Sequence, residues 1–192
     1  ARCDQAYDMQ RSLQSSPELL LTLRLMIDLA IERRAYDVAE TYCRQALEQA
    51  EAIQNMGELA ALYYSMTVVM RVQKRLHEAQ EYCTRSQALF EKMGDRGFLA
   101  LAYYEQCRVQ ALLGERAAAL ISGEKSVTLF RALDERFNLV YVLDHLGQVQ
   151  ADLGNYTAAQ AAWQEALVTA EPLMHPRLDQ LRSQLGAIPD QQ

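Results

Sequence analysis

The chain has 192 residues, half of them apolar, and a formal net charge of −6. This apolar fraction excludes disorder as the default, and the acidic balance argues against direct binding of DNA or RNA, which requires Lys and Arg to neutralise phosphates. No run approaches the roughly 20 apolar residues that a membrane helix needs. The sequence therefore predicts a cytoplasmic protein with no direct nucleic-acid partner and no membrane partner.

Helices are the expected elements, because helix-forming residues dominate, proline is scarce and no alternating strand pattern occurs. Residues 1–14 align with the second helix of a hairpin, which predicts the end of a truncated preceding repeat. Apolar residues then recur at spacings of three and four along the chain. These segments predict helices over 17–33, 36–53, 57–73, 76–93, 97–113, 115–133, 137–153 and 155–171. The expected fold class is all-α.

Residues of similar type recur every 40 positions, which is typical of a helical repeat. An alanine recurs in every second helix, where a small side chain lets two helices of a hairpin approach closely. The columns are Ala39, Ala79, Ala119 and Ala159; Arg34, Lys74, Gly114 and Gly154; Leu19, Leu59, Leu99 and Leu139; and Cys3, Cys43, Cys83, Gly123 and Trp163. Each 40-residue unit therefore predicts one helix-turn-helix hairpin.

The predicted domain organisation follows from these columns. It consists of repeats over 15–54, 55–94, 95–134 and 135–173, a capping helix over 174–187 and a tail over 188–192. In the capping helix Leu178, Leu181 and Leu185 form one apolar stripe among polar residues, as expected where an array shields its last apolar face.

Helix starts and ends also recur in register. Ser15, Asn55 and Asp95 are good N-cap residues, and Glu58 completes a capping-box pattern with Asn55. Gly114 suits the left-handed position that follows a helix. These positions predict where the turns lie.

The last hairpin resembles the tetratricopeptide repeat family. The residues that match its pattern are Leu143, Leu146, Gly147, Gly154, Asn155, Tyr156, Ala159, Trp163, Ala166 and Leu167, with leucine in place of the first aromatic residue. Earlier hairpins depart from the pattern, because the position equivalent to Gly147 is occupied by Cys107, Thr67 and Ile27. The resemblance covers residues 17–172. It implies an α-α superhelix, a TPR solenoid of about four hairpins with a C-terminal capping helix.

The spacing of 40 residues, with joins such as Met93-Gly94-Asp95, looks like that of arrays in bacterial signalling proteins. These include ATP-dependent transcriptional activators of the maltose-regulator type and related switch ATPases. The resemblance implies a protein-protein interaction or sensory module of a larger signalling or transcription-regulatory protein. The alternative is a sensor domain that binds a small effector, and a self-assembling scaffold is a further possibility.

No arrangement of residues indicates catalysis, a cofactor or a metal. Equivalent positions of Cys3, Cys43 and Cys83 in successive hairpins would hold the thiols roughly 10 Å apart, too far to share a metal or a disulfide. His77 and His175 are interpreted as surface or capping residues. The sequence thus predicts a protein that is not an enzyme.

The predicted binding site is a groove lined by the first helix of each hairpin, on the face opposite its packed stripe. Its residues are Arg24, Asp28, Tyr64, Val68, Arg71, Leu101, Tyr104, Arg108, Tyr141, Asp144, His145 and Gln148. Tyr and Arg are common in binding hot spots, so the expected partner is an acidic or aromatic-containing peptide, or the protein's own upstream domain. The alternative is an ordinary amphipathic surface. Alanine at Tyr104 and Arg108 is expected to abolish binding without lowering the melting temperature.

Overall fold

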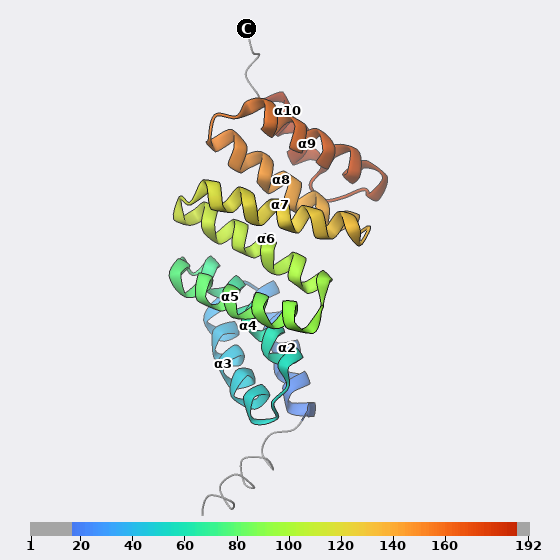
Figure 1. The fold of residues 1–192 in the computed structure, drawn as a ribbon. Coiled ribbons are helices and arrows are strands. Elements are labelled where there is room, and N and C mark those ends of the chain that lie inside the picture. The colour runs from blue at the N-terminus through green and yellow to red at the C-terminus, as the bar shows by residue number, and fades with distance from the viewer. Residues whose placement is uncertain (1–16, 188–192) are drawn as a thin grey trace, which may run out of the picture. The chain divides into compact units, whose positions relative to one another are not determined.

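The computed structural model describes residues 17–187, and all regular structure within this range is helical (Figure 1). The predicted preceding repeat over 1–14 and the tail over 188–192 lie outside the described residues, as does the Ser15 cap. The chain divides into two compact units, residues 1–94 and 95–192. Each unit contains two helical hairpins.

Unit 1 is built from two hairpins whose helices pack in pairs, α2 with α3 and α4 with α5. The helices are α2 (Pro17–Glu32), α3 (Tyr36–Ala52), α4 (Met56–Val72) and α5 (Leu76–Met93). The two hairpins are joined by packing of α3 against α4. An ion pair between Arg24 and Glu58, 3.2 Å apart, links α2 to α4.

Unit 2 repeats this arrangement and adds a terminal helix. Its elements are α6 (Arg96–Leu113), α7 (Arg116–Ala132), α8 (Arg136–Asp152), α9 (Tyr156–Ala170), η1 (Glu171–Leu173) and α10 (Leu178–Gly186). The bounds of α2 to α9 fall within one residue of the ranges expected from the sequence. The all-α fold of four hairpins and a capping helix is therefore confirmed.

The alanine column lies where the two helices of each hairpin meet, and all four of its members are fully buried. In two of the hairpins a serine two helical turns further along adds a hydrogen bond between the helices. Ser86 donates to the carbonyl of Ala60 at 3.0 Å, and Ser126 donates to the carbonyl of Ala100 at 2.7 Å. Both pairs are 26 residues apart, so this contact follows the 40-residue repeat.

A residue with a left-handed backbone follows every helix from α2 to α9 at intervals of 20 residues. These residues are Arg34, Gln54, Lys74, Gly94, Gly114, Asp134, Gly154 and Met174. The prediction that Gly114 adopts this conformation is confirmed. Gly154, Arg34 and Lys74, which stand in the same repeat column, adopt it as well. The repeat is thus more regular in its backbone than in its sequence.

The predicted N-caps Asn55 and Asp95 are confirmed, because their side chains accept hydrogen bonds from the backbone N–H groups of Glu58 and Phe98. The capping box at Asn55 is only half made. Its backbone N–H donates to the carbonyl of Ala50, and the Glu58 carboxylate pairs with Arg24. The Glu58 carboxylate and the Asn55 backbone N–H, which a full capping box would join, are therefore each bonded to another group.

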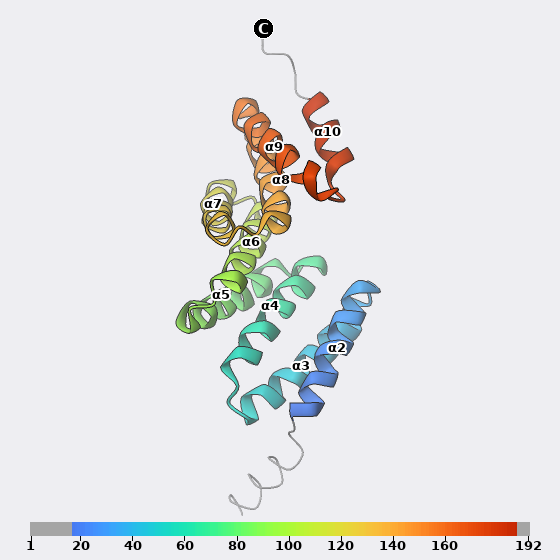
Figure 2. The same cartoon turned by 90° about the vertical axis from the view of Figure 1, so that its right-hand side faces the viewer.

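The terminal helix α10 lies beside α8 and α9 (Figure 2). Leu181 is fully buried, while Leu178 and Leu185 are half-buried against the same core, as the stripe predicted. Of the two interpretations of His175, surface or capping, the surface one is wrong, because only 2% of the residue is exposed. Tyr156 is exposed at the start of α9.

Candidate binding surface

The residues predicted to line the groove come together most clearly in unit 2, on α6 and α8. The ring of Tyr104 meets the ring of His145 edge-on, with 6.1 Å between their centroids. The guanidinium of Arg108 lies 5.4 Å from the centroid of Tyr104, as in a cation–π contact. Burial raises the pKa of Tyr104 to about 12. We call Tyr104, Arg108 and His145 the α6–α8 cluster.

Arg108 is held in place from within its own helix. Its Nη1 donates to the Glu105 carboxylate at 2.7 Å, and the Glu105 side chain is almost entirely buried. Removing Arg108 would take an ion-pair partner from this buried carboxylate, which costs more than losing a surface pair. Because both side chains are packed, we expect alanine at Tyr104 and Arg108 to lower the melting temperature as well as to weaken binding.

Asp144 does not line an open groove, since only 5% of the residue is exposed. Its Oδ2 pairs with Arg177 at 3.1 Å and accepts a hydrogen bond from Gln180 at 3.4 Å. Burial raises the pKa of the Asp144 carboxyl, and the charge of Arg177 opposes that rise. A partner would have to displace the C-terminal segment to reach this carboxylate.

Tyr141 is covered in part by the same segment. The ring of His175 lies 4.6 Å from the ring of Tyr141 and 4.4 Å from that of Phe137, measured between centroids. The guanidinium of Arg177 lies 5.3 Å from the centroid of Tyr141. We call the contact of His175 and Arg177 with Phe137, Tyr141 and Asp144 the C-terminal clasp.

The sequence interpretation missed the role of His175 and Arg177 in this region. The signal that would have found them is the leucine stripe of the capping helix. A capping helix takes the place of the next first helix in an array, so the residues beside its stripe face the last first helix, here α8.

The groove residues of unit 1 are less uniform. Arg24 is paired with Glu58 and Asp28 is exposed, whereas Tyr64 and Val68 are half-buried. Arg71 is buried, with 8% exposed. In unit 2, Leu101 is half-buried and the exposed Gln148 donates to Asp152 at 2.9 Å. Binding by any of these residues stays a prediction.

The cysteines that the structure describes are packing residues. Cys43, Cys83 and Cys107 are buried free thiols, and burial raises the pKa of Cys43 and of Cys107 to about 12. Over residues 17–187, no three or more His, Cys, Asp or Glu side chains gather as metal ligands would. No helix in that range is both long and apolar enough to cross a membrane.

The C-terminal clasp should make the stability of unit 2 depend on pH. Burial lowers the pKa of His175, whose Nδ1 accepts a hydrogen bond from the Arg177 backbone N–H at 3.1 Å. A histidine with a lowered folded-state pKa stabilises the fold above its unfolded value of about 6.5, and this contribution is lost as the pH falls through the folded pKa. We expect the melting temperature to decline from pH 7 to about 5.5.

Asp144 has the opposite sign, because its raised pKa means that protonation relieves the buried charge and favours folding at lower pH. The decline should therefore weaken below about pH 5, near the usual range of carboxyl groups. Thermal unfolding followed by circular dichroism checks both effects. His175→Phe should flatten the decline between pH 7 and 5.5, while His77→Phe, at an exposed position, should leave it unchanged. An unchanged profile in His175→Phe would exclude His175 as the titrating group.

Comparison with known proteins finds likeness in structure but not in sequence. No family model and no curated protein matches the chain. The apo form of RapI has a TM-score of 0.79 at 15% identity, covering 88% of this chain and 62% of RapI. A Rap protein complexed with competence and sporulation factor also has a TM-score of 0.79, at 16% identity, covering 95% of this chain and 52% of that one.

These values show a shared helical-repeat fold, in agreement with the tetratricopeptide-type repeat that the sequence pattern implied. The chain spans less than two thirds of the length of either Rap protein.

Proposed function

We propose that the chain is an interaction module that binds a segment of another polypeptide, or a neighbouring domain of its own protein. It acts by binding rather than by catalysing a reaction. Its setting would be a larger cytoplasmic signalling or regulatory protein, in which occupancy of the module reports the presence of the partner.

The observation that carries this proposal is the α6–α8 cluster. Arg108 is fixed between the Glu105 carboxylate and the Tyr104 ring, and 32% of its side chain is exposed. A guanidinium that is already ordered loses little conformational entropy when it binds a carboxylate. Tyrosine and arginine side chains in this state have the character of hot spots. The chemistry favours an acidic or aromatic segment.

The structural likeness gives independent support. A Rap protein with the same fold is known as a complex with competence and sporulation factor. The fold is therefore one that holds a bound partner in at least that case. Since this chain spans only part of the Rap proteins, the partner here is proposed from the chemistry of its own surface.

A peptide library displayed on phage and selected against the folded chain would test the proposal. We expect recovered peptides to be rich in Asp, Glu and aromatic residues. Arg108→Gln should weaken their binding about tenfold, because it removes a charge-assisted contact. Glutamine keeps a donor for Glu105, so folding should be retained. Fluorescence anisotropy with a labelled peptide measures the affinity.

Arg116→Gln is the matched control. Arg116 is an exposed arginine at the first position of α7 in the same unit, and it should not alter the affinity. Equal affinities for wild type and Arg108→Gln would remove the α6–α8 cluster from the binding site. Failure to recover any peptide would argue against the polypeptide-binding function itself.

A further inference from the structure

A cavity of about 360 Å³ opens in unit 2 where the start of α6, the end of α7 and the start of α8 meet. Its walls are Asp95, Gly97, Phe98, Leu101, Phe130, Leu133, Glu135 and Asn138. Pockets for whole small ligands are about 300 to 1,000 Å³, so this one lies at the lower end of that range. The size fits one side chain better than a complete effector molecule.

The cavity is apolar along its walls. Phe98 is 42% exposed and Leu133 is 38% exposed, which is high for large apolar side chains that belong to a packed hairpin. Phe130, at 1% exposed, connects this cavity to the core of the unit. An occupant with an apolar stem would remove the exposed faces of Phe98 and Leu133 from water.

The rim supplies hydrogen-bond acceptors in excess. Asp95 Oδ1 accepts the backbone N–H of Phe98, while Oδ2 has no partner among residues 17–187. Within the same residues, the side chain of Glu135 has no hydrogen bond or ion pair, although it stands at the N-cap position of α8. An occupant must therefore bring donors. A carboxylate would be repelled, and a purely apolar group would desolvate the rim without compensation.

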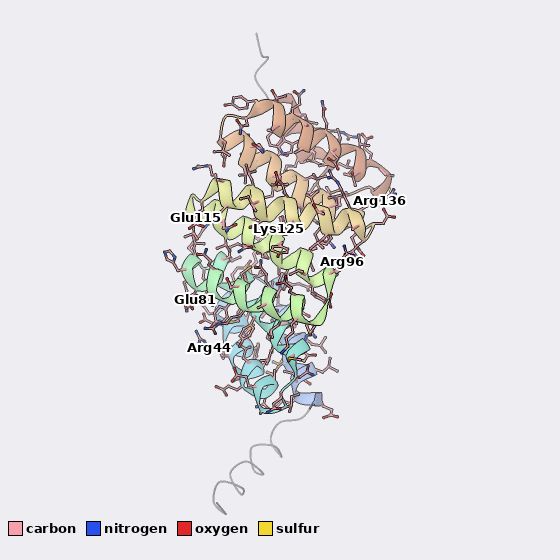
Figure 3. All side chains as sticks on the ribbon, viewed as in Figure 1. Arg44, Glu81, Arg96, Glu115, Lys125 and Arg136 are labelled. Carbon is pink, nitrogen blue, oxygen red and sulfur yellow. The ribbon has the colours of Figure 1, made fainter. Side chains whose placement is uncertain are left out.

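The arginines next in sequence do not fill the cavity. Arg96 and Arg136 lie at the same edge of unit 2 as the cavity (Figure 3), but neither forms its wall. Arg136 donates to Asp134 at 2.8 Å, which occupies its guanidinium on the adjacent turn. Asp95 and Glu135 thus line the cavity without an ion pair to either of these neighbouring arginines.

We propose that this cavity binds the side chain of a lysine or arginine. The stem would pack on Phe98 and Leu133, and the charged end would donate to Asp95 and Glu135. The inference rests on the proposed function, because the bound polypeptide would deliver this residue.

The position of the cavity also sets where that residue stands in the partner. Leu101, Tyr104 and Arg108 lie three and four residues apart on α6, so the cavity and the α6–α8 cluster share a helix face. From Asp95 to Arg108 the helix rises about 20 Å, a length that an extended chain spans in about six residues. The partner would carry a basic residue and an acidic residue at about that separation.

A small probe tests the cavity without the natural partner. Adding N-acetyl-arginine amide to the ¹⁵N-labelled chain should shift the backbone resonances of residues 95–98 and 133–138 saturably. N-acetyl-norleucine amide, which lacks the charge, should shift them much less. The double variant Asp95→Asn, Glu135→Gln should bind the arginine probe at least about fivefold more weakly, because both charged acceptors are lost.

The variants are chosen to keep the fold. Asparagine serves as a cap at the equivalent Asn55, and Glu135 makes no capping hydrogen bond, so Glu135→Gln alone remains usable if the double variant is unstable. Glu115→Gln is the matched control. Glu115 is also an N-cap glutamate without a capping bond, and it lies at the opposite edge of unit 2 (Figure 3). Its replacement should leave probe binding unchanged.

Either of two results would overturn the inference: equal shifts from the arginine and norleucine probes, or equal affinity of the rim variants and wild type. Both results are distinct from a failure of the proposed function. The latter is read from the effect of Arg108→Gln on peptide binding, a comparison in which the rim carboxylates are unchanged.

Discussion

Replacing Trp163 with alanine is expected to lower the free energy of unfolding by about 3 to 5 kcal/mol, the usual range for deleting a large buried aromatic side chain. Trp163 is 4% exposed and belongs to the core of unit 2. Its Nε1 donates to the carbonyl of Asp144 at 3.0 Å, so the ring also fixes α9 against α8. Gly147 lies against the ring and has no side chain to fill the space.

Thermal and urea unfolding followed at 222 nm would measure this loss. A change of several kcal/mol corresponds to a fall in melting temperature of about 10 °C. Tyr156→Ala is the control, because this aromatic residue is exposed on the same helix and should change stability by no more than about 0.5 kcal/mol. Similar losses for the two variants would show that Trp163 is not a principal contact of the last hairpin.

The second large effect is expected at Gly123, where a side chain has no room. A Cβ atom there would lie 2.5 Å from Leu146 Cδ2, 2.9 Å from Leu146 Cγ and 3.2 Å from the Cys107 sulfur. We expect Gly123→Val to destabilise the fold by about 3 kcal/mol, at the upper end of the usual cost of overpacking. The same unfolding measurements apply.

Leu146→Ala should rescue part of that loss, because it removes the two nearest atoms. The loss in free energy of unfolding of the double variant should then be smaller than the sum of the two single losses by about 0.5 to 3 kcal/mol. Gly57→Ala provides the control, since its Cβ would meet only Asn55 Oδ1 at 3.5 Å. That change should stabilise α4 by about 0.5 to 1 kcal/mol. Additive losses in the Gly123 and Leu146 variants would contradict the packing described.

The fold was predictable from the sequence because its main determinants are local and recur. Helix periodicity, N-caps such as Asn55 and Asp95, and the alanine column each depend on residues close in sequence or one repeat apart. It was harder to predict from the sequence that a glycine in one repeat column is matched by a large side chain in another. Gly147 provides the space that the Trp163 ring fills in the last hairpin, whereas in the preceding one Leu146 of α8 packs against Gly123.

The candidate site was predictable only in part. The sequence identified the α6–α8 cluster, but it treated the face opposite the packed stripe as open to solvent. In an array that face is also where the next first helix approaches, as His145 of α8 does at Tyr104 of α6. The C-terminal segment approaches α8 in the same way and buries Asp144. These longer-range contacts decide which residues remain exposed. The apolar periodicity of a single helix does not predict them.

The left-handed residues that follow the helices have a consequence for how the array can change. At Arg34, Gln54, Lys74, Asp134 and Met174 a residue with a Cβ atom occupies a conformation that costs roughly 1 kcal/mol and that glycine adopts freely. Glycine at any of these five turns would therefore avoid that cost and stabilise the fold. None of the five residues belongs to the α6–α8 cluster. The stability of the module can therefore rise through substitutions in its turns while the binding residues on its helices change independently.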